Sequence, residues 1–125
     1  MTRRTELQRI ADMIDAGERS IRHLGGRDLA GLVADELRSD ATVRALEVMG
    51  EAAKHVSKPN RDRFAAIPWP QIAGMRDRLI HGYDVVDWEI VWDTVTRFVP
   101  MALPELRAAF TVLSAEEPPP PEAPS

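Results

Sequence analysis

The 125-residue chain contains no cysteine. This absence excludes disulfide bonds and thiolate chemistry, and it makes a reducing cytoplasm the default location. Histidine is scarce too, and His23, His55 and His81 are isolated from one another. Zinc sites need clustered His or Cys, and helical di-metal sites need Glu-x-x-His pairs. The nearest match is Glu51 with His55 at a four-residue spacing, so we expect no metal site and no cofactor.

Long apolar runs are also missing. No run approaches the roughly 20 residues that a membrane helix needs, and no apolar segment follows the charges of residues 1–6, as it would in a signal peptide. Apolar residues make up 44% of the chain and charged residues 29%, which is ordinary for a globular protein. We expect one domain with a modest core and no membrane partner.

The net charge of −4 argues against a protein that coats nucleic acid non-specifically, but the charges are unevenly distributed. Residues 54–81 carry six cations against two anions, whereas the remaining chain carries ten cations and eighteen anions. A basic surface in this region would attract a polyanion. Lys54, Lys58 and Arg78 are its candidate RNA-binding residues. The alternative, that residues 58–63 form only a solvated loop, remains open.

Apolar periodicity predicts an all-α chain, with helices over about 5–24, 29–33 and 36–57. Gly25 and Gly26 should end the first helix, and Asp28 should cap the second. Residues 58–60 should break the third helix. A last helix should begin after Asp87, which is a good N-cap, and its internal prolines, Pro100 and Pro104, should kink it. We expect a helical domain over 1–114 and a disordered tail, rich in Pro and Glu, over 115–125.

The third predicted helix carries a glycine in its interior, Gly50, which costs about 1 kcal/mol relative to alanine. Close approach of another helix or of the segment described next would compensate for this cost. Glu47 and Glu51 lie four residues apart on one face of the same helix. They either support the residues of that segment or form a solvated acidic edge.

Residues 75–84 hold the densest cluster of proton-transfer, cationic and phenolic groups in the chain. We expect a helix from about Pro70 to Gly82, on which Asp77 lies four residues before His81 and orients its imidazole. Arg76 would lie about 140° around the axis from His81, so a second copy of the chain would help to complete a site. His, Arg and a carboxylate suit phosphodiester chemistry. A solvated helix end is the alternative.

The segment from Arg76 to Tyr83 resembles the Arg-x4-His-x-Tyr motif of the HEPN superfamily, in its HepT toxin branch. The resemblance extends to residues 46–54, to residues 69–92 with Val86 and Asp87, and over nearly the whole chain up to about residue 114. It implies an antiparallel bundle of about five helices that forms a homodimer, with both copies of the motif lining a shared cleft.

The same resemblance implies a metal-independent endoribonuclease from a cytoplasmic prokaryotic toxin–antitoxin pair. Arg76 and His81 would be its catalytic pair, and Asp77 would fill the polar position after the arginine. The partner would be a MntA-like nucleotidyltransferase antitoxin that adds AMP to Tyr83 and so blocks the toxin. Two other functions remain open at this stage: a module that binds RNA or nucleotide without cleaving it, and a structural helper of the nucleotidyltransferase.

Overall fold

The computed structural model describes residues 4–81 and 85–116. In chain order its elements are α1 (Glu6–Leu24), α2 (Leu29–Ala34), α3 (Glu36–Lys54), α4 (Lys58–Arg63), α5 (Trp69–Ala73), α6 (Met75–Leu79), β1 (Ile80–His81), β2 (Val85–Val86), α7 (Trp88–Asp93), the π-helical segment η1 (Thr94–Phe98) and α8 (Val99–Glu116). Apart from the two short strands, the regular elements are helical, which confirms the all-α prediction.

The helix ends near the N-terminus follow local sequence signals. Thr5 accepts a hydrogen bond from the Gln8 N–H and caps α1, and Gly25 ends α1 in the left-handed conformation with φ of 61°. Asp28 caps α2, as predicted. One expectation was wrong: residues 58–63 are a helix, α4, because Ser57 accepts a hydrogen bond from the Asn60 N–H and caps it.

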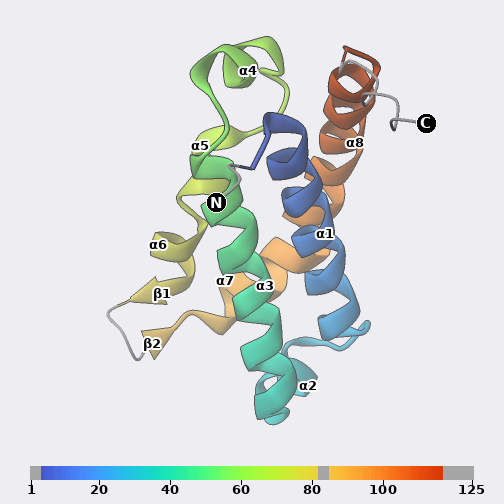
Figure 1. Cartoon of the computed structure of the whole chain (residues 1–125). Helices are drawn as coiled ribbons and strands as arrows, with labels where there is room; N and C mark the ends of the chain where they lie inside the picture. Colours follow the sequence, from blue (N-terminus) through green and yellow to red (C-terminus); the bar gives the residue numbers. More distant parts are fainter. Residues whose placement is uncertain (1–3, 82–84, 117–125) are drawn as a thin grey trace, which may run out of the picture.

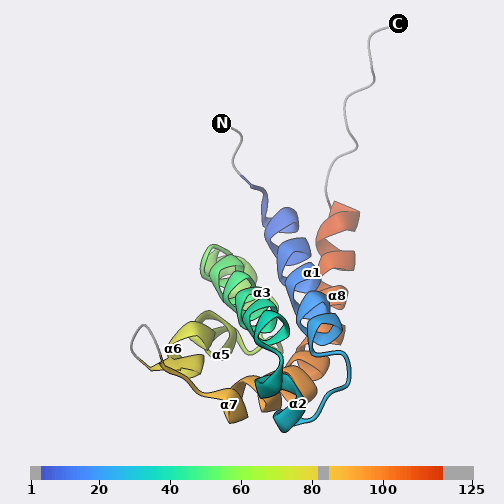
Figure 2. The ribbon, with the colours of Figure 1, turned by 90° about the horizontal axis from the view of Figure 1, so that it is seen from below.

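The core lies where α1 packs between α3 and α8 (Figures 1 and 2). Large apolar side chains from the three helices are fully buried there: Ile10 and Met13 from α1, Leu46 and Met49 from α3, and Leu106 from α8. Each such side chain contributes about 1.5–3 kcal/mol relative to its exposed state. These three helices form the scaffold against which the later, shorter elements are placed.

The elements α7, η1 and α8 form one continuous helix, Trp88–Glu116. In the π-helical turn the Val99 N–H donates to the carbonyl of Thr94, five residues earlier. Pro100 follows at once and has no N–H to donate, and π-turns commonly occur at such interruptions. Figure 1 shows α7 and α8 running in different directions on either side of η1. Pro104 lies inside α8.

By length and composition alone, this 29-residue helix could cross a membrane, since the mean hydropathy of its most apolar window is 1.2. One face of it nevertheless lies in the protein core, through Val91, Val95, Val99, Leu103 and Leu106. A helix that packs against a protein core can pass the same test of length and composition, so one such helix is weak evidence for a membrane span. That the protein has no membrane partner stays a prediction.

The predicted helix from Pro70 to Gly82 is wrong at its C-terminal end, where Ile80 and His81 are extended; Gly82 lies outside the described residues. The helical part is divided into α5 and α6 at Gly74 and ends at Leu79. Ile80 and His81 are extended and pair with Val86 and Val85 in an antiparallel hairpin. The β-branched residues at three of these four positions favour extended backbone.

Gly50 allows the backbone of α5 to lie close to α3. A Cβ atom at Gly50 would lie 2.8 Å from the carbonyl oxygen of Ile72 and 3.6 Å from Cβ of Met75. The glycine thus permits the predicted close approach, and the segment that approaches is the one that leads into α6. The position of Arg76 relative to α3 depends on this contact.

We expect Gly50→Ala to destabilise the protein by about 1–3 kcal/mol, the usual cost of overpacking. The atom that the new methyl group meets is backbone and cannot rotate away. Urea unfolding followed by circular dichroism measures the change. Stabilisation would contradict the close packing of α5 on α3, because alanine is otherwise the better helix former by about 1 kcal/mol.

Candidate active site

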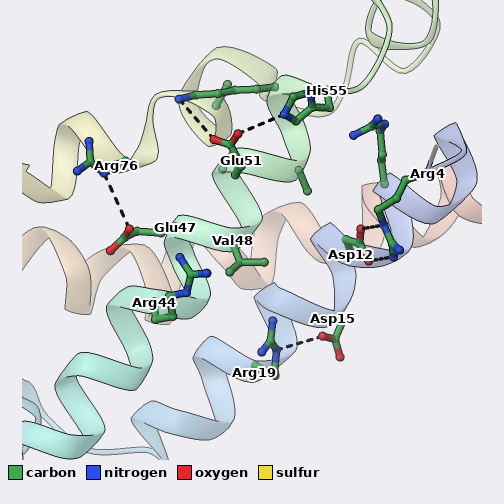
Figure 3. Close-up of a pocket in the computed structure, with 15 residues that line it drawn as sticks. Arg4, Asp12, Asp15, Arg19, Arg44, Glu47, Val48, Glu51, His55 and Arg76 are labelled. Atoms are coloured by element: carbon green, nitrogen blue, oxygen red, sulfur yellow. Dashed lines mark hydrogen bonds and ion pairs between the residues drawn. The ribbon is translucent and has the colours of Figure 1, made fainter. Parts of the chain in front are cut away.

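Arg76 extends from α6 toward α3. Its Nε lies 3.9 Å from Oε2 of Glu47, an ion pair in which the arginine side chain is 62% exposed and the glutamate 27%. Figure 3 shows the two side chains facing one another between their helices. Glu47 is therefore placed to support Arg76, the first of the two interpretations given for Glu47 above. The Arg76 side chain stays mostly exposed to solvent.

His81 lies on β1 and is 60% exposed. Its Nε2 is 3.7 Å from Oδ2 of Asp87, the residue that caps α7 by accepting a hydrogen bond from the Ile90 N–H. The predicted helical pairing of Asp77 with His81 is wrong, because α6 ends at Leu79 and the i, i+4 relationship ends with it. Asp87 replaces Asp77 as the carboxylate facing the imidazole.

The sequence predicted Asp87 only as a helix cap. No local spacing rule relates residues 81 and 87, because their proximity depends on strand pairing rather than on helical periodicity. The available signal was the pair of β-branched segments on either side of residues 82–84, which is typical of a hairpin. The predicted helix from Pro70 to Gly82 covered the first of these segments, so the hairpin was not expected.

A groove of about 520 Å³ runs between α1 and α3 and reaches Arg76 (Figure 3). Among the side chains that line it, six are cationic and four are carboxylates: Arg4, Arg9, Arg19, Arg44, Lys54 and Arg76, with Asp12, Asp15, Glu47 and Glu51. Ion pairs link several of them, including Arg4 with Asp12 and Arg19 with Asp15. The charged side chains of the groove are therefore basic in sum, and the groove places Lys54 on the same surface as Arg76.

Glu51 lies beside this groove but is paired within its own helix. Its carboxylate lies 3.2 Å from Nε2 of His55 and 3.9 Å from Nζ of Lys54, and it is 65% exposed. This placement fits the acidic-edge interpretation better than support of Arg76 or His81. The Glu51–His55 spacing noted in the sequence is thus an exposed side-chain contact.

The other predicted RNA-binding residues are not gathered in one place. Lys58 lies on α4, at the end of the molecule away from the hairpin (Figure 1), and pairs with Asp62 at 2.7 Å.

Glu6 of α1 anchors α4 by accepting hydrogen bonds from the Ser57 N–H and Asn60 Nδ2. Burial raises the pKa of Glu6, but these hydrogen bonds outweigh it and the net pKa is lowered.

Arg78 is exposed on α6, two residues after Arg76. Tyr83, the predicted modification site, lies outside the described residues. Within residues 4–81 and 85–116, no group of three or more His, Asp or Glu side chains is placed to hold a metal ion. Metal independence itself stays a prediction.

The geometry supports a defined chemistry. An exposed imidazole next to a carboxylate is suited to accept and return a proton near neutral pH. An exposed guanidinium beside a second carboxylate is suited to stabilise charge on phosphoryl oxygens. The two groups follow one another within six residues of chain, Arg76 to His81, but each is held by a carboxylate from a different element.

A family model described as "Ribonuclease HepT-like" matches residues 7–109. Similar proteins include an inferred RNase of Caldanaerobacter subterraneus subsp. tengcongensis, 40% identical over 80 residues that cover 64% of this chain and 71% of the relative. An inferred ribonuclease HepT of Thermococcus cleftensis is 36% identical over 94 residues, covering 75% and 83%. An inferred RNase of Methanocaldococcus jannaschii is 48% identical over 70 residues, covering 56% and 54%. No solved structure gives a significant match.

Proposed function

This chain belongs to the ribonuclease HepT-like family and is an endoribonuclease; we propose that it cuts RNA with Arg76 and His81, without a metal ion. The observation that carries this proposal is that both side chains are exposed and each faces a carboxylate, Glu47 or Asp87. Such pairing restrains a catalytic side chain while leaving its reactive face accessible.

The proposed reaction is a transfer within the RNA chain. The ribose 2′-oxygen attacks the neighbouring phosphorus while His81 accepts the proton of the 2′-hydroxyl. The bond from phosphorus to the 5′-oxygen breaks, the leaving oxygen takes up a proton from water, and His81 returns its proton to the solvent, so that the proton balance closes. Arg76 stabilises the charge that develops on the non-bridging oxygens. The products are a 2′,3′-cyclic phosphate and a 5′-hydroxyl end.

We expect the active form to be a homodimer in which two copies of Arg76 and His81 line one cleft. The support is that neither side chain is enclosed by its own chain, since their exposed fractions are 62% and 60%. Catalytic electrostatics are strongest where water is excluded. A second copy of the chain would supply that enclosure.

The test of the cleavage mechanism is the pair of variants Arg76→Ala and His81→Ala. Each should reduce cleavage of a single-stranded RNA by at least about 100-fold, because each removes a proton-transfer or charge-stabilising group. Gel analysis with end-group chemistry would detect the 2′,3′-cyclic phosphate, and excess EDTA should not change the rate.

Arg97→Ala and His23→Ala are the matched controls, because they remove the same side-chain types elsewhere. Arg97 is 76% exposed and pairs only with Asp93 among the described residues. Both control variants should retain wild-type activity. Persistent cleavage by the Arg76→Ala, His81→Ala double variant would contradict the mechanism.

The biological role that fits this site is that of the toxin in a prokaryotic, cytoplasmic toxin–antitoxin pair. The partner would be a MntA-like nucleotidyltransferase that adds AMP to Tyr83. Tyr83 is two residues from His81 in the sequence. A bulky, negatively charged group there would block the entry of RNA and repel its phosphates.

Co-expression with such a nucleotidyltransferase should add the mass of AMP to the peptide containing Tyr83 and abolish RNA cleavage. The chain has one tyrosine, so Tyr83→Phe should prevent any tyrosine modification and keep growth arrest in the presence of the partner. Intact-protein and peptide mass spectrometry make the measurement. An unmodified Tyr83 in a complex that is already inactive would contradict this form of neutralisation.

A further inference from the structure

Asp87 makes two different contacts with its two carboxylate oxygens. Oδ1 accepts a hydrogen bond of 3.2 Å from the Ile90 N–H and so caps α7. Oδ2 faces Nε2 of His81 at 3.7 Å. A capping role requires only one oxygen, so the second oxygen is available for the imidazole.

The backbone around Asp87 is fixed on both sides. Its N–H donates to the carbonyl of Leu79 at 2.7 Å, and its carbonyl accepts from the Val91 N–H at 3.0 Å. Leu79 is fully buried, and Val91 is too. Asp87 is therefore attached both to the end of α6, directly before β1, and to the core helix α7.

The hairpin determines how His81 meets this carboxylate. His81 pairs with Val85, and Ile80 with Val86, in an antiparallel register. Ile80 and Val86 pack against the core, so β1 cannot slip by one residue without exposing them. The imidazole is consequently held on the Asp87 side of the hairpin.

We propose that Asp87 is a positioning residue of the ribonuclease: its Oδ2 accepts the Nε2 proton of neutral His81 and leaves Nδ1 free to receive the proton of the RNA 2′-hydroxyl. This inference rests on the proposed function for its catalytic consequence, but the contact itself can be tested without RNA. The 3.7 Å separation exceeds a normal hydrogen bond. Catalytic hydrogen bonds are commonly long in the free enzyme, and a carboxylate at this distance still favours a proton on the nitrogen that faces it.

The substitution Asp87→Asn keeps the capping contact with Ile90 and changes the contact with His81. Asparagine is as good an N-cap as aspartate, so its Oδ1 continues to accept from the Ile90 N–H. Its amide NH₂ then occupies the place of Oδ2 and presents a donor to His81. A donor at that point favours the Nδ1–H tautomer, in which the nitrogen needed as the base is already protonated.

The experiment compares Asp87→Asn with the wild-type protein by long-range ¹H–¹⁵N NMR of the histidine rings, at a pH where the ring is neutral. The chain has three histidines, and His81→Gln assigns the relevant signals. We expect mainly the Nε2–H tautomer in the wild type and a shift toward Nδ1–H in the variant. In RNA cleavage, kcat should fall about 10- to 100-fold, with KM within about twofold.

Two further variants distinguish positioning from folding. Asp93→Asn removes one negative charge from the other end of α7, where Asp93 pairs with Arg97, and should leave the tautomer and kcat unchanged. Asp87→Ala removes the cap as well and should lower the thermal unfolding midpoint, whereas Asp87→Asn should not.

An Asp87→Asn protein with the wild-type tautomer would overturn the proposal, and so would one with the kcat of Asp93→Asn. A wild-type protein that does not cleave RNA would overturn the proposed function instead. The ring-nitrogen spectra would still decide whether Asp87 holds His81.

Discussion

The arrangement of this site depends on the antiparallel pairing of β1 with β2. The hydrogen bond from the Asp87 N–H to the Leu79 carbonyl adds to this pairing and ends helix α6 before the histidine. Had the helix continued, His81 would have lain above Asp77 and not opposite Asp87. With the hairpin in place, the imidazole meets a carboxylate that is itself fixed at a helix N-terminus.

The fold supplies two carboxylates from distant parts of the chain, Glu47 of α3 and Asp87 before α7. Each depends on a different packing constraint. The Arg76–Glu47 contact needs the close approach of α5 to α3, which a glycine at position 50 permits. The His81–Asp87 contact needs the hairpin register. The proposed site thus consists of exposed side chains whose carboxylate partners are only partly exposed, which keeps Arg76 and His81 open to a large substrate.

Features determined by local chemistry could be predicted from the sequence. The caps Asp28 and Asp87, the glycine end of α1 and the close approach at Gly50 all follow from the preferences of single residues or short spacings. Arg76 and His81 were named from the cluster at residues 75–84 and from the motif resemblance, and Glu47 was named from its four-residue spacing with Glu51. The contacts that were missed are non-local: strand pairing replaced the predicted helix at Ile80 and His81, and the role of Asp87 follows from that pairing. The α4 helix was missed because Pro59 was taken as a break, although proline is favoured in a first helical turn.

The most direct test of this account is the backbone conformation of Ile80 and His81 in solution, measured by NMR. The hairpin predicts extended Cα and Cβ chemical shifts at both residues, nuclear Overhauser contacts between residues 80 and 86, and slow exchange of the Asp87 amide proton. Helical shifts continuing through His81, with a rapidly exchanging Asp87 amide, would contradict it.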